Sequence, residues 1–222
     1  MCIKNLNNND KEIYILIKML IDIRTLIQTY RLNITGILHV GAHLCEELND
    51  YRQIGVIDDN IIWIEGNPSI YNKIKDSGIK NVYNALISDE EKKVDFIITN
   101  NGQSSSILEL EEHKKEHPWV HEIARLEMNT KRLDNFLKEN EIKLPFNFIN
   151  LDIQGHELAA LKSLGSYINQ VNYIYTEINI RYLYKNCSLL NEIDDYLFNN
   201  RFIRLDTKLT QHGWGDAFYM KF

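Results

Sequence analysis

Residues 34–43 read ITGILHVGAH, residues 61–68 read IIWIEGNP, and these two segments decide the fold of the chain. Each is an apolar run that ends in small or polar residues, and the polar residues 44–54 between them are compatible with a helix. An apolar strand, a small-residue turn, a helix and a second apolar strand form the βαβ unit of nucleotide-binding sheets. The sequence therefore predicts parallel strands at 36–40 and 61–65, with a ligand site where they end.

Gly41 and Glu65 are the two residues of this unit that point to a ligand. Gly41 has no Cβ, so its backbone can come close to a bound molecule. Glu65 lies 24 residues further on, near the roughly 20-residue spacing at which an acid holds the ribose in such units. The alternative is a solvated glutamate at an ordinary strand end.

The size and charge of the chain limit its class. With 222 residues, 44% of them hydrophobic and 25% charged, it has the composition of one globular domain. Its 25 basic and 31 acidic residues give a net charge of −6, which opposes broad binding to nucleic acid or to anionic membranes. We therefore expect a small-molecule partner.

Three cysteines, Cys2, Cys45 and Cys187, have neither the number nor the spacing of a disulfide framework or a zinc site. The first residues lack the pattern of a secretion signal, and charged residues interrupt the most apolar window, residues 13–30. We expect a reducing, cytoplasmic location and no membrane span.

The remaining pattern describes further strands and helices around the βαβ unit. Strands are predicted at 81–87, 94–99, 126–130, 146–152, 171–177, 202–206 and 217–222. Helices are predicted at 11–32, 68–77, 133–139, 154–164 and 188–200. Residues 1–33 then form a helical extension before a domain at 34–222. This extension should cover the sheet edge or form a homodimer contact, since its apolar residues recur at helical spacing.

Three acids, Glu65, Asp152 and Glu177, each close a predicted apolar strand. In an open parallel sheet, ligands bind beyond the carboxyl ends of the strands. We therefore expect the three side chains to face one crevice. The alternative for each acid is an N-cap of the following helix.

Two polar segments in the middle of the chain are weaker candidates. Residues 100–106 form a hydroxyl-rich turn, which by composition is a surface loop. His113, His117 and His121 are four residues apart, a spacing at which a helix can chelate a metal. Pro118 interrupts that helix, so the metal interpretation is the weaker one.

Seven motifs resemble, in chain order, the FkbM family of S-adenosylmethionine-dependent methyltransferases. They are HVGAH (39–43), IEGNP (64–68), NGQSSS (101–106), TKRLD (130–134), LDIQGHE (151–157), TEI (176–178) and WGDA (214–217). The resemblance covers residues 34–222. It implies an α/β class I methyltransferase fold, a Rossmann-like arrangement of three layers (αβα). The sheet would have seven mostly parallel strands and an antiparallel last strand.

The resemblance also implies a cofactor site for S-adenosylmethionine. Its residues would be His39, Gly41, Ala42, His43, Glu65, Gly66, Asn67, Ser104, Ser105, Ser106 and Asp152. Within this set the turn at Gly41 would support the methionine part, and Glu65 would hold the ribose hydroxyls. Two positions depart from the family: an acid commonly stands at His39, and a glycine at Cys45.

The implied reaction is methyl transfer to a hydroxyl of a sugar, a nucleotide-sugar, a glycan or another small molecule. A general base must take the hydroxyl proton, and the candidates are Asp152, His156 and Glu177. Alternatively, Asp152 and Glu177 hold a divalent ion such as Mg²⁺ that activates the hydroxyl. Trp214, Tyr182 and Tyr184 are candidates for stacking on a sugar face.

Two other functions compete with methyl transfer. An NAD(P)-dependent reductase should carry a three-glycine fingerprint, which this sequence lacks beyond Gly41. Tyr71 and Lys75 have the spacing of a reductase dyad but come too early in the chain. A non-enzymatic scaffold with a vestigial cofactor pocket is the second competitor, because of His39 and Cys45.

Overall fold

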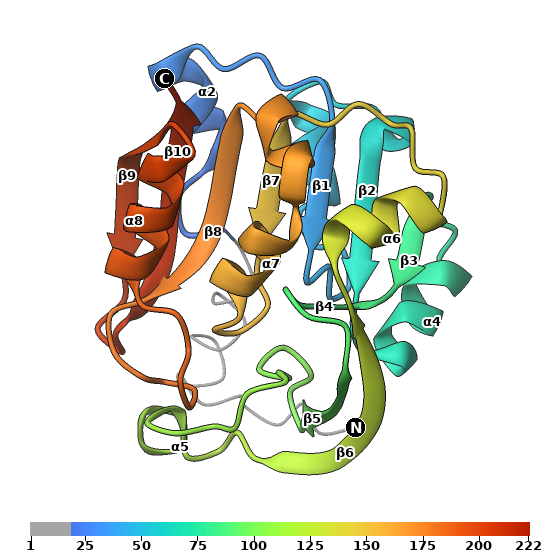
Figure 1. Cartoon of the computed structure of the whole chain (residues 1–222), viewed down its shortest axis with the longest axis vertical. Coiled ribbons are helices and arrows are strands. Elements are labelled where there is room, and N and C mark those ends of the chain that lie inside the picture. The colour runs from blue at the N-terminus through green and yellow to red at the C-terminus, as the bar shows by residue number, and fades with distance from the viewer. Residues whose placement is uncertain (1–18) are drawn as a thin grey trace, which may run out of the picture.

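The computed structural model describes residues 19–222, and Figure 1 labels its elements. The helices are α2 (Ile23–Tyr30), α3 (Leu48–Gln53), α4 (Pro68–Asp76), α5 (His113–Glu116), α6 (Leu133–Glu139), α7 (Glu157–Ser163) and α8 (Leu190–Asn199). The strands are β1 (Ile37–Val40), β2 (Ile61–Glu65), β3 (Val82–Asn84), β4 (Leu86–Ile87), β5 (Lys93–Thr99), β6 (Glu122–Lys131), β7 (Phe148–Leu151), β8 (Tyr173–Asn179), β9 (Phe202–Leu209) and β10 (Trp214–Lys221).

Seven strands form the main sheet in the order β3-β2-β1-β7-β8-β10-β9 (Figure 1). β1 is parallel to both of its neighbours, and β7 is parallel to β8. The last strand, β10, runs antiparallel to β8 and to β9. This arrangement confirms the class I prediction. β10 begins at Trp214, earlier than the predicted residue 217.

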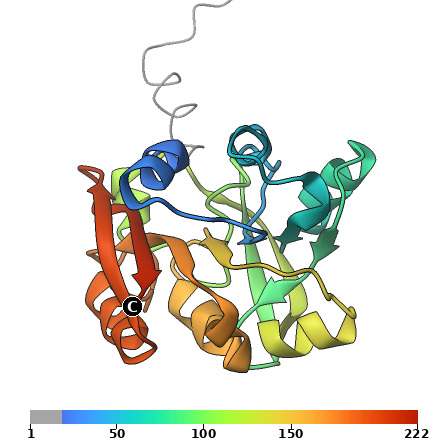
Figure 2. The same cartoon turned by 90° about the horizontal axis from the view of Figure 1, so that it is seen from above.

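Helices cover both faces of the sheet, as the view from above shows (Figure 2). Alternate residues of a strand point to opposite faces, so Leu38 and Val40 join the core under α6, α7 and α8. Ile37 joins the opposite core, under α2, α3 and α4. The parallel strands read as continuous apolar runs because both of their faces are buried.

α2 packs on the sheet near the strands of the terminal hairpin. The ring of Tyr30 stacks on Phe218 of β10 at 5.7 Å, and its hydroxyl donates to the carbonyl of Leu205 in β9. Of the predicted helix at 11–32, the structure confirms Ile23–Tyr30. The prediction is wrong for residues 19–22, which are described and not helical, and residues 11–18 lie outside the described residues. Within residues 19–222, no helix has the length and apolar composition that a bilayer crossing requires.

An insertion between β3 and α6 forms a second, three-stranded sheet in the order β4-β6-β5. The single strand predicted at 81–87 is wrong, because the chain leaves the main sheet at Ala85. β3 pairs with β2, whereas β4 pairs with the end of β6 at Thr130. β5 and β6 form a long antiparallel ribbon beyond the lower end of the main sheet (Figure 1).

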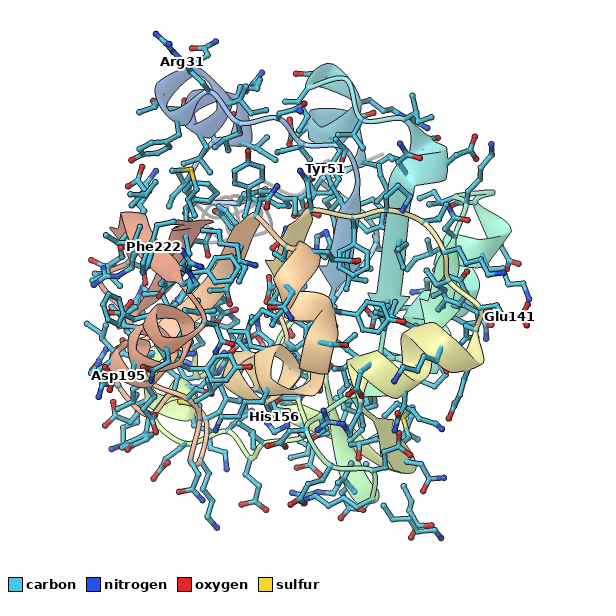
Figure 3. The ribbon with its side chains drawn as sticks, turned by 45° about the horizontal axis from the view of Figure 1, so that its top comes forward. Arg31, Tyr51, Glu141, His156, Asp195 and Phe222 are labelled. Atoms are coloured by element: carbon cyan, nitrogen blue, oxygen red, sulfur yellow. The ribbon has the colours of Figure 1, made fainter. Side chains whose placement is uncertain are left out.

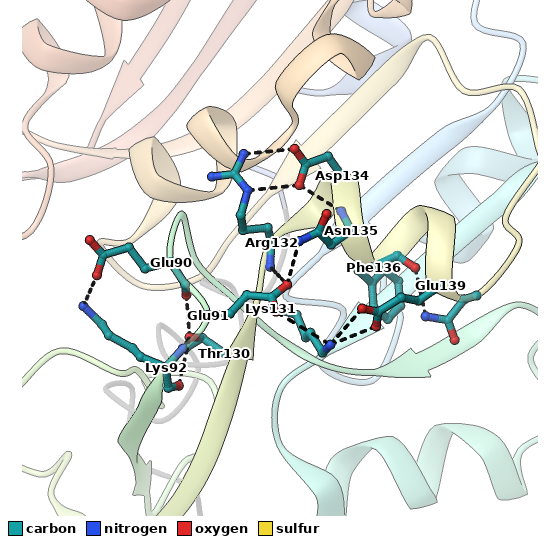
Figure 4. A network of polar contacts seen from close by, with 11 residues as sticks. Glu90, Glu91, Lys92, Thr130, Lys131, Arg132, Asp134, Asn135, Phe136 and Glu139 are labelled. Atoms are coloured by element: carbon teal, nitrogen blue, oxygen red, sulfur yellow. Dashed lines mark hydrogen bonds and ion pairs between the residues drawn. The ribbon is translucent and has the colours of Figure 1, made fainter.

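A polar network fixes the base of this insertion (Figure 4). The guanidinium of Arg132 donates to both oxygens of Asp134 at 3.0 Å and to the carbonyl of Asp89 at 2.7 Å. The hydroxyl of Thr130 donates to the carbonyl of Glu90. The motif at 130–134 therefore joins β6 to α6 and does not line the cavity described below.

Candidate active site

A cavity lies at the carboxyl ends of β1, β2, β7 and β8. Glu65, Asp152 and Glu177 all line it, as expected for acids at the ends of neighbouring parallel strands. Only Glu65 and Asp152 stand at or just past a strand end. Glu177 does not close its strand, because β8 continues to Asn179.

The structure shows a packing reason for glycine at position 41. Its φ is +90°, and a Cβ built there would lie 1.8 Å from the carbonyl oxygen of Asp152. The turn after β1 therefore packs directly against the backbone that follows β7. The missing side chain makes room for the chain itself. Gly41 also lines the cavity, and its place beside the cofactor stays a prediction.

The carboxylate of Glu65 is held in place by two backbone groups. The amide of Asn67 donates to Oε1 at 2.6 Å, and the amide of His43 donates to Oε2 at 2.8 Å. Burial raises the pKa of Glu65 to about 7, although the two amides oppose that shift. Each oxygen of Glu65 still has one lone pair that can accept a hydrogen bond. The buried carboxylate can therefore accept from two hydroxyl groups.

Gln154 connects the other two acids. Its Nε2 donates to Oδ1 of Asp152 at 2.6 Å and to Oε2 of Glu177 at 2.5 Å. The hydroxyl of Tyr184 donates to Oε1 of Gln154 at 2.5 Å. Burial raises the pKa of Glu177 well above its usual value, and the charge of Asp152 adds to this shift. Burial and the neighbouring charge therefore both favour the protonated form of Glu177.

Asp152 and Glu177, the predicted metal ligands, both accept a hydrogen bond from the side-chain amide of Gln154. A cation bound between the two acids would have to displace this amide. Among residues 19–222, no group of three or more His, Cys, Asp or Glu side chains is arranged to hold a metal ion. His113 and His117 lie together, but α5 ends at Glu116 and His121 is exposed. The three histidines do not share a helical face.

Glu157 shapes the turn that carries Asp152, and the sequence did not indicate this role. It is fully buried, and its Oε1 accepts the amides of Ile153 and Gly155 at 3.0 Å. Burial raises its pKa to about 7. Gln154, between these amides, adopts a φ of +57°, so Glu157 stabilises the strained turn that aims Gln154 at the two acids.

His39 and His156 have separate surroundings. Figure 3 labels His156 and Tyr51, the hydrogen-bond partner of His39. The ring of His39 packs on Trp63 at 4.9 Å, and its Nδ1 hydrogen-bonds the hydroxyl of Tyr51 under α3. Burial lowers the pKa of His39 to about 3, so its imidazole is a core group. His156, at the start of α7, hydrogen-bonds Ser88 through Nε2 at 3.0 Å, and burial lowers its pKa to about 4.

The remaining predicted cofactor residues frame the cavity in two groups. Ala42, His43 and Gly66 line it next to Glu65. Asn67 does not line it, and its side chain instead caps α4 by accepting the amide of Ser69.

The second group is Ser104, Ser105 and Ser106, which we call the serine loop. Their three hydroxyls form hydrogen bonds with other residues of the chain. Ser106 Oγ donates to the carbonyl of Gln154 at 2.9 Å, Ser105 Oγ accepts the amide of Thr99, and Ser104 Oγ accepts from Asn101. All three serines line the cavity. The loop is thus a fixed wall against the turn that follows β7.

The turn after Ala42 adds two cavity acids that the sequence analysis missed. Glu46 accepts a hydrogen bond or ion pair from Nδ1 of His43 at 2.6 Å. Glu47 is buried, which raises its pKa to about 8. Cys45 adopts a φ of +58°, a conformation in which glycine is favoured, and this agrees with the glycine expected there.

The buried acids predict how stability depends on pH. Those with pKa values raised to about 7 or 8 by burial are Glu47, Glu65, Glu157 and Asp216. Between their ordinary values and these values the folded protein binds more protons than the unfolded chain, so stability falls as pH rises. Three buried histidines have the opposite effect, because their lowered pKa values make stability rise with pH, but only below the ordinary histidine pKa of 6.5. They are His39, His113 and His156.

We therefore expect the thermal unfolding midpoint of the ligand-free protein to fall from about pH 6.5 to about pH 8.5. The buried acids lose their protons in this interval, because their pKa values in the folded protein are about 7 to 8. Differential scanning calorimetry at constant ionic strength measures it. A midpoint that rises over this interval contradicts the assignment of protonated acids in the folded state.

Comparison with known proteins places this site in a family context. The model of the family described as "Methyltransferase FkbM domain" matches residues 39–204. The 2-O-methyltransferase NoeI of Sinorhizobium fredii (strain NBRC 101917 / NGR234) is 27% identical over 123 residues, which are 52% of this chain and 50% of NoeI. The alignment thus spans about half the length of that relative.

Solved structures with a similar arrangement are methyltransferases of low sequence identity. Magnesium protoporphyrin IX methyltransferase of Synechocystis PCC 6803, with bound SAM, is 9% identical, with a TM-score of 0.48 over 90% of this chain and 76% of that one. An S-adenosylmethionine-dependent methyltransferase of Clostridium acetobutylicum ATCC 824 is 10% identical, with a TM-score of 0.48 over 90% of this chain and 89% of the other.

Proposed function

Because the chain belongs to the FkbM methyltransferase family, we propose that it transfers a methyl group from S-adenosylmethionine to a hydroxyl oxygen of a small acceptor, with a sugar or glycan as the leading class. The observation that carries this proposal is the doubly anchored carboxylate of Glu65 in the cavity at the strand ends. NoeI is a 2-O-methyltransferase, which supports the choice of oxygen as the nucleophile.

The residues present fit the cofactor. A carboxylate has about four acceptor positions, and the amides of His43 and Asn67 use one on each oxygen of Glu65. The positions left match the two hydroxyls of a ribose. When bound, S-adenosylmethionine supplies a methyl group activated by a positively charged sulfur, and a cavity lined by carboxyl groups favours such a cation.

Asp152 is the residue of the site best placed to take the acceptor's proton. Its side chain is exposed to the cavity, and Gln154 holds one of its oxygens. Glu177 is the poorer candidate, since burial raises its pKa and disfavours its charged form. His156 is neutral and able to accept a proton, but its Nε2 already faces Ser88.

The competing functions make different demands on the same cavity. The reductase needs a tyrosine and a lysine beside the cofactor, whereas Tyr71 and Lys75 lie on α4, where the lysine packs over the tyrosine ring. Neither residue lines the cavity. The scaffold alternative predicts that no methyl donor binds.

Calorimetry with S-adenosylmethionine, its demethylated product and NAD tests the proposal. We expect the first two to bind and NAD not to bind. Glu65→Gln should lower the affinity for the donor about 100-fold, because it replaces charge-assisted hydrogen bonds worth about 3 kcal/mol. The substitution also places the side-chain NH₂ group of the glutamine next to one of the two backbone amides that donate to Glu65, so that two donors face each other.

Two controls separate ribose recognition from misfolding. Glu139→Gln, at the exposed end of α6, changes the same chemical group away from the cavity and should leave affinity unchanged. A 2′-deoxyribose analogue of the demethylated product should bind the wild-type protein more weakly than the parent compound does. The Glu65→Gln variant should bind the analogue and the parent compound with equal affinity. If neither donor nor product binds wild-type protein, the methyltransferase proposal is wrong.

A further inference from the structure

One wall of the cavity comes from the insertion rather than from the main sheet. We define the α5 loop as residues 107–121, and its residues His113, His117 and Trp119 line the cavity. The loop lies beyond the carboxyl ends of the parallel strands (Figure 1). Tyr184 and Trp214 line the same cavity from the segments after β8 and at the start of β10.

Hydrogen bonds and ion pairs hold the α5 loop in place. The amide of His113 donates to the carbonyl of Leu183 at 3.1 Å. Glu116 contacts Nδ1 of His212 at 2.9 Å and Nη2 of Arg181 at 3.2 Å. These contacts join the loop to two other parts of the chain, so the wall is already formed in the protein.

Aromatic and imidazole rings of this wall pack in a row. The ring centroids are 5.3 Å apart for Tyr184 and His113, 4.8 Å for His113 and His117, and 4.8 Å for His117 and His212. Trp119 contacts the ring of His117 edge-on at 5.4 Å. Trp119 is 47% exposed, so a large ring face is open to a ligand at the edge of the cavity.

The polar groups of the row carry no positive charge into the cavity. Burial lowers the pKa of His113 to about 4 and also lowers that of His117, so both rings are neutral at pH 7. His113 is 6% exposed, and its Nδ1 has no hydrogen-bond partner among the described residues. A buried polar atom without a partner needs an explanation, and a ligand in the cavity provides one.

Within residues 19–222, the cavity lacks the cationic side chains that bind phosphate. Among the described residues that line it, five are acids and none is lysine or arginine. The acids are Glu46, Glu47, Glu65, Asp152 and Glu177. Phosphate recognition depends on arginine, lysine or exposed backbone amides, and a phosphate among these carboxyl groups would have no neutralising partner.

We infer that the α5 loop is the acceptor subsite, and that it takes an uncharged ring bearing hydroxyl groups, such as a glycosyl unit without phosphate. This inference rests on the proposed function and narrows its acceptor. The open face of Trp119 stacks on the ring, as aromatic side chains do with apolar ring faces. Carboxyl groups accept from the hydroxyls. Nucleotide-sugars and sugar phosphates would find no lysine or arginine among the described cavity residues to pair with their phosphate groups.

Binding to the protein loaded with the demethylated cofactor product tests the inference. The probes are the methyl glycosides of glucose, galactose and mannose, compared with the 1-phosphates of the same sugars by saturation-transfer NMR. At least one methyl glycoside should bind, and its 1-phosphate should bind at least about tenfold more weakly, the ratio that about 1.4 kcal/mol of charge repulsion produces. Equal binding of the phosphate, or no binding of any methyl glycoside, overturns the inference.

Variants locate the subsite. Trp119→Ala should weaken glycoside binding about tenfold, whereas Trp119→Phe should keep most of it. Phe198→Ala, which removes an exposed ring outside the cavity, is the matched control and should change nothing. Unchanged binding by Trp119→Ala places the acceptor elsewhere. Cofactor affinity, measured in parallel, identifies failure of the proposed function itself.

Discussion

Gly41→Ala is expected to remove much of the free energy of unfolding. An alanine at a φ of +90° is strained by about 1–2 kcal/mol. Its Cβ would also lie 1.8 Å from the carbonyl oxygen of Asp152, so the turn after β1 and the end of β7 must move apart. Because small domains are stable by only about 5–15 kcal/mol, the combined cost removes much of that margin. Urea unfolding followed by circular dichroism measures it.

Gly55→Ala is the matched control for this prediction. Gly55 also has a positive φ, +89°, but a Cβ there meets nothing within 4 Å. It should therefore show the conformational cost alone, about 1–2 kcal/mol. If the two variants lose the same free energy of unfolding, the contact between the β1 turn and the β7 backbone does not limit stability, and our account of Gly41 is incorrect.

The second large effect concerns turnover. Asp152→Asn should lower kcat by about 10²–10⁴-fold, the usual contribution of a positioned general base. Donor affinity should change little, because no hydrogen bond joins Asp152 to Glu65 or to its amide partners. Mass spectrometry of an acceptor that gains one methyl group gives the rate, and calorimetry gives the affinity.

The pH profile separates a base from a residue that only positions Gln154. If Asp152 takes the proton, the acidic limb of the kcat profile should disappear in Asp152→Asn. A purely positioning role would lower kcat and keep the limb. Asp76→Asn, an exposed change at the end of α4, should match wild type. Full turnover by Asp152→Asn removes this residue from the mechanism and leaves His156 to be tested.

Sequence reasoning was most successful where hydrophobic periodicity is strong. The runs that became β1, β2 and β7 are buried on both faces, and this requirement is visible as continuous apolar sequence. It failed at Ala85, where the chain changes sheets, because residues 81–87 are equally compatible with one strand or two short ones. It did not indicate that the ring of His39 packs on Trp63, because a histidine inside an apolar run gives no sign of its neighbours. His39 also lines the cavity, and its predicted place beside the cofactor stays a prediction.

The residues that the sequence did not indicate act through partners far away in the chain. Gln154 reaches Glu177 and Tyr184, and neither contact has a local signature. Glu157 reads as an ordinary acid in the first turn of a helix, yet it is buried and binds the backbone of its own turn. Burial depends on how the whole chain packs, so it cannot be predicted from amino-acid composition.

By itself, then, the sequence determined the layered parallel sheet, because alternating and continuous apolar patterns admit few other packings. It also determined that acids gather at the strand ends, because parallel strands bring those ends to one edge. Only the tertiary structure decided that the α5 loop folds over this edge and that Trp119 and His113 line the cavity. Those positions depend on backbone bonds and ion pairs between distant segments, such as Glu116 with His212, and no local pattern specifies such pairs.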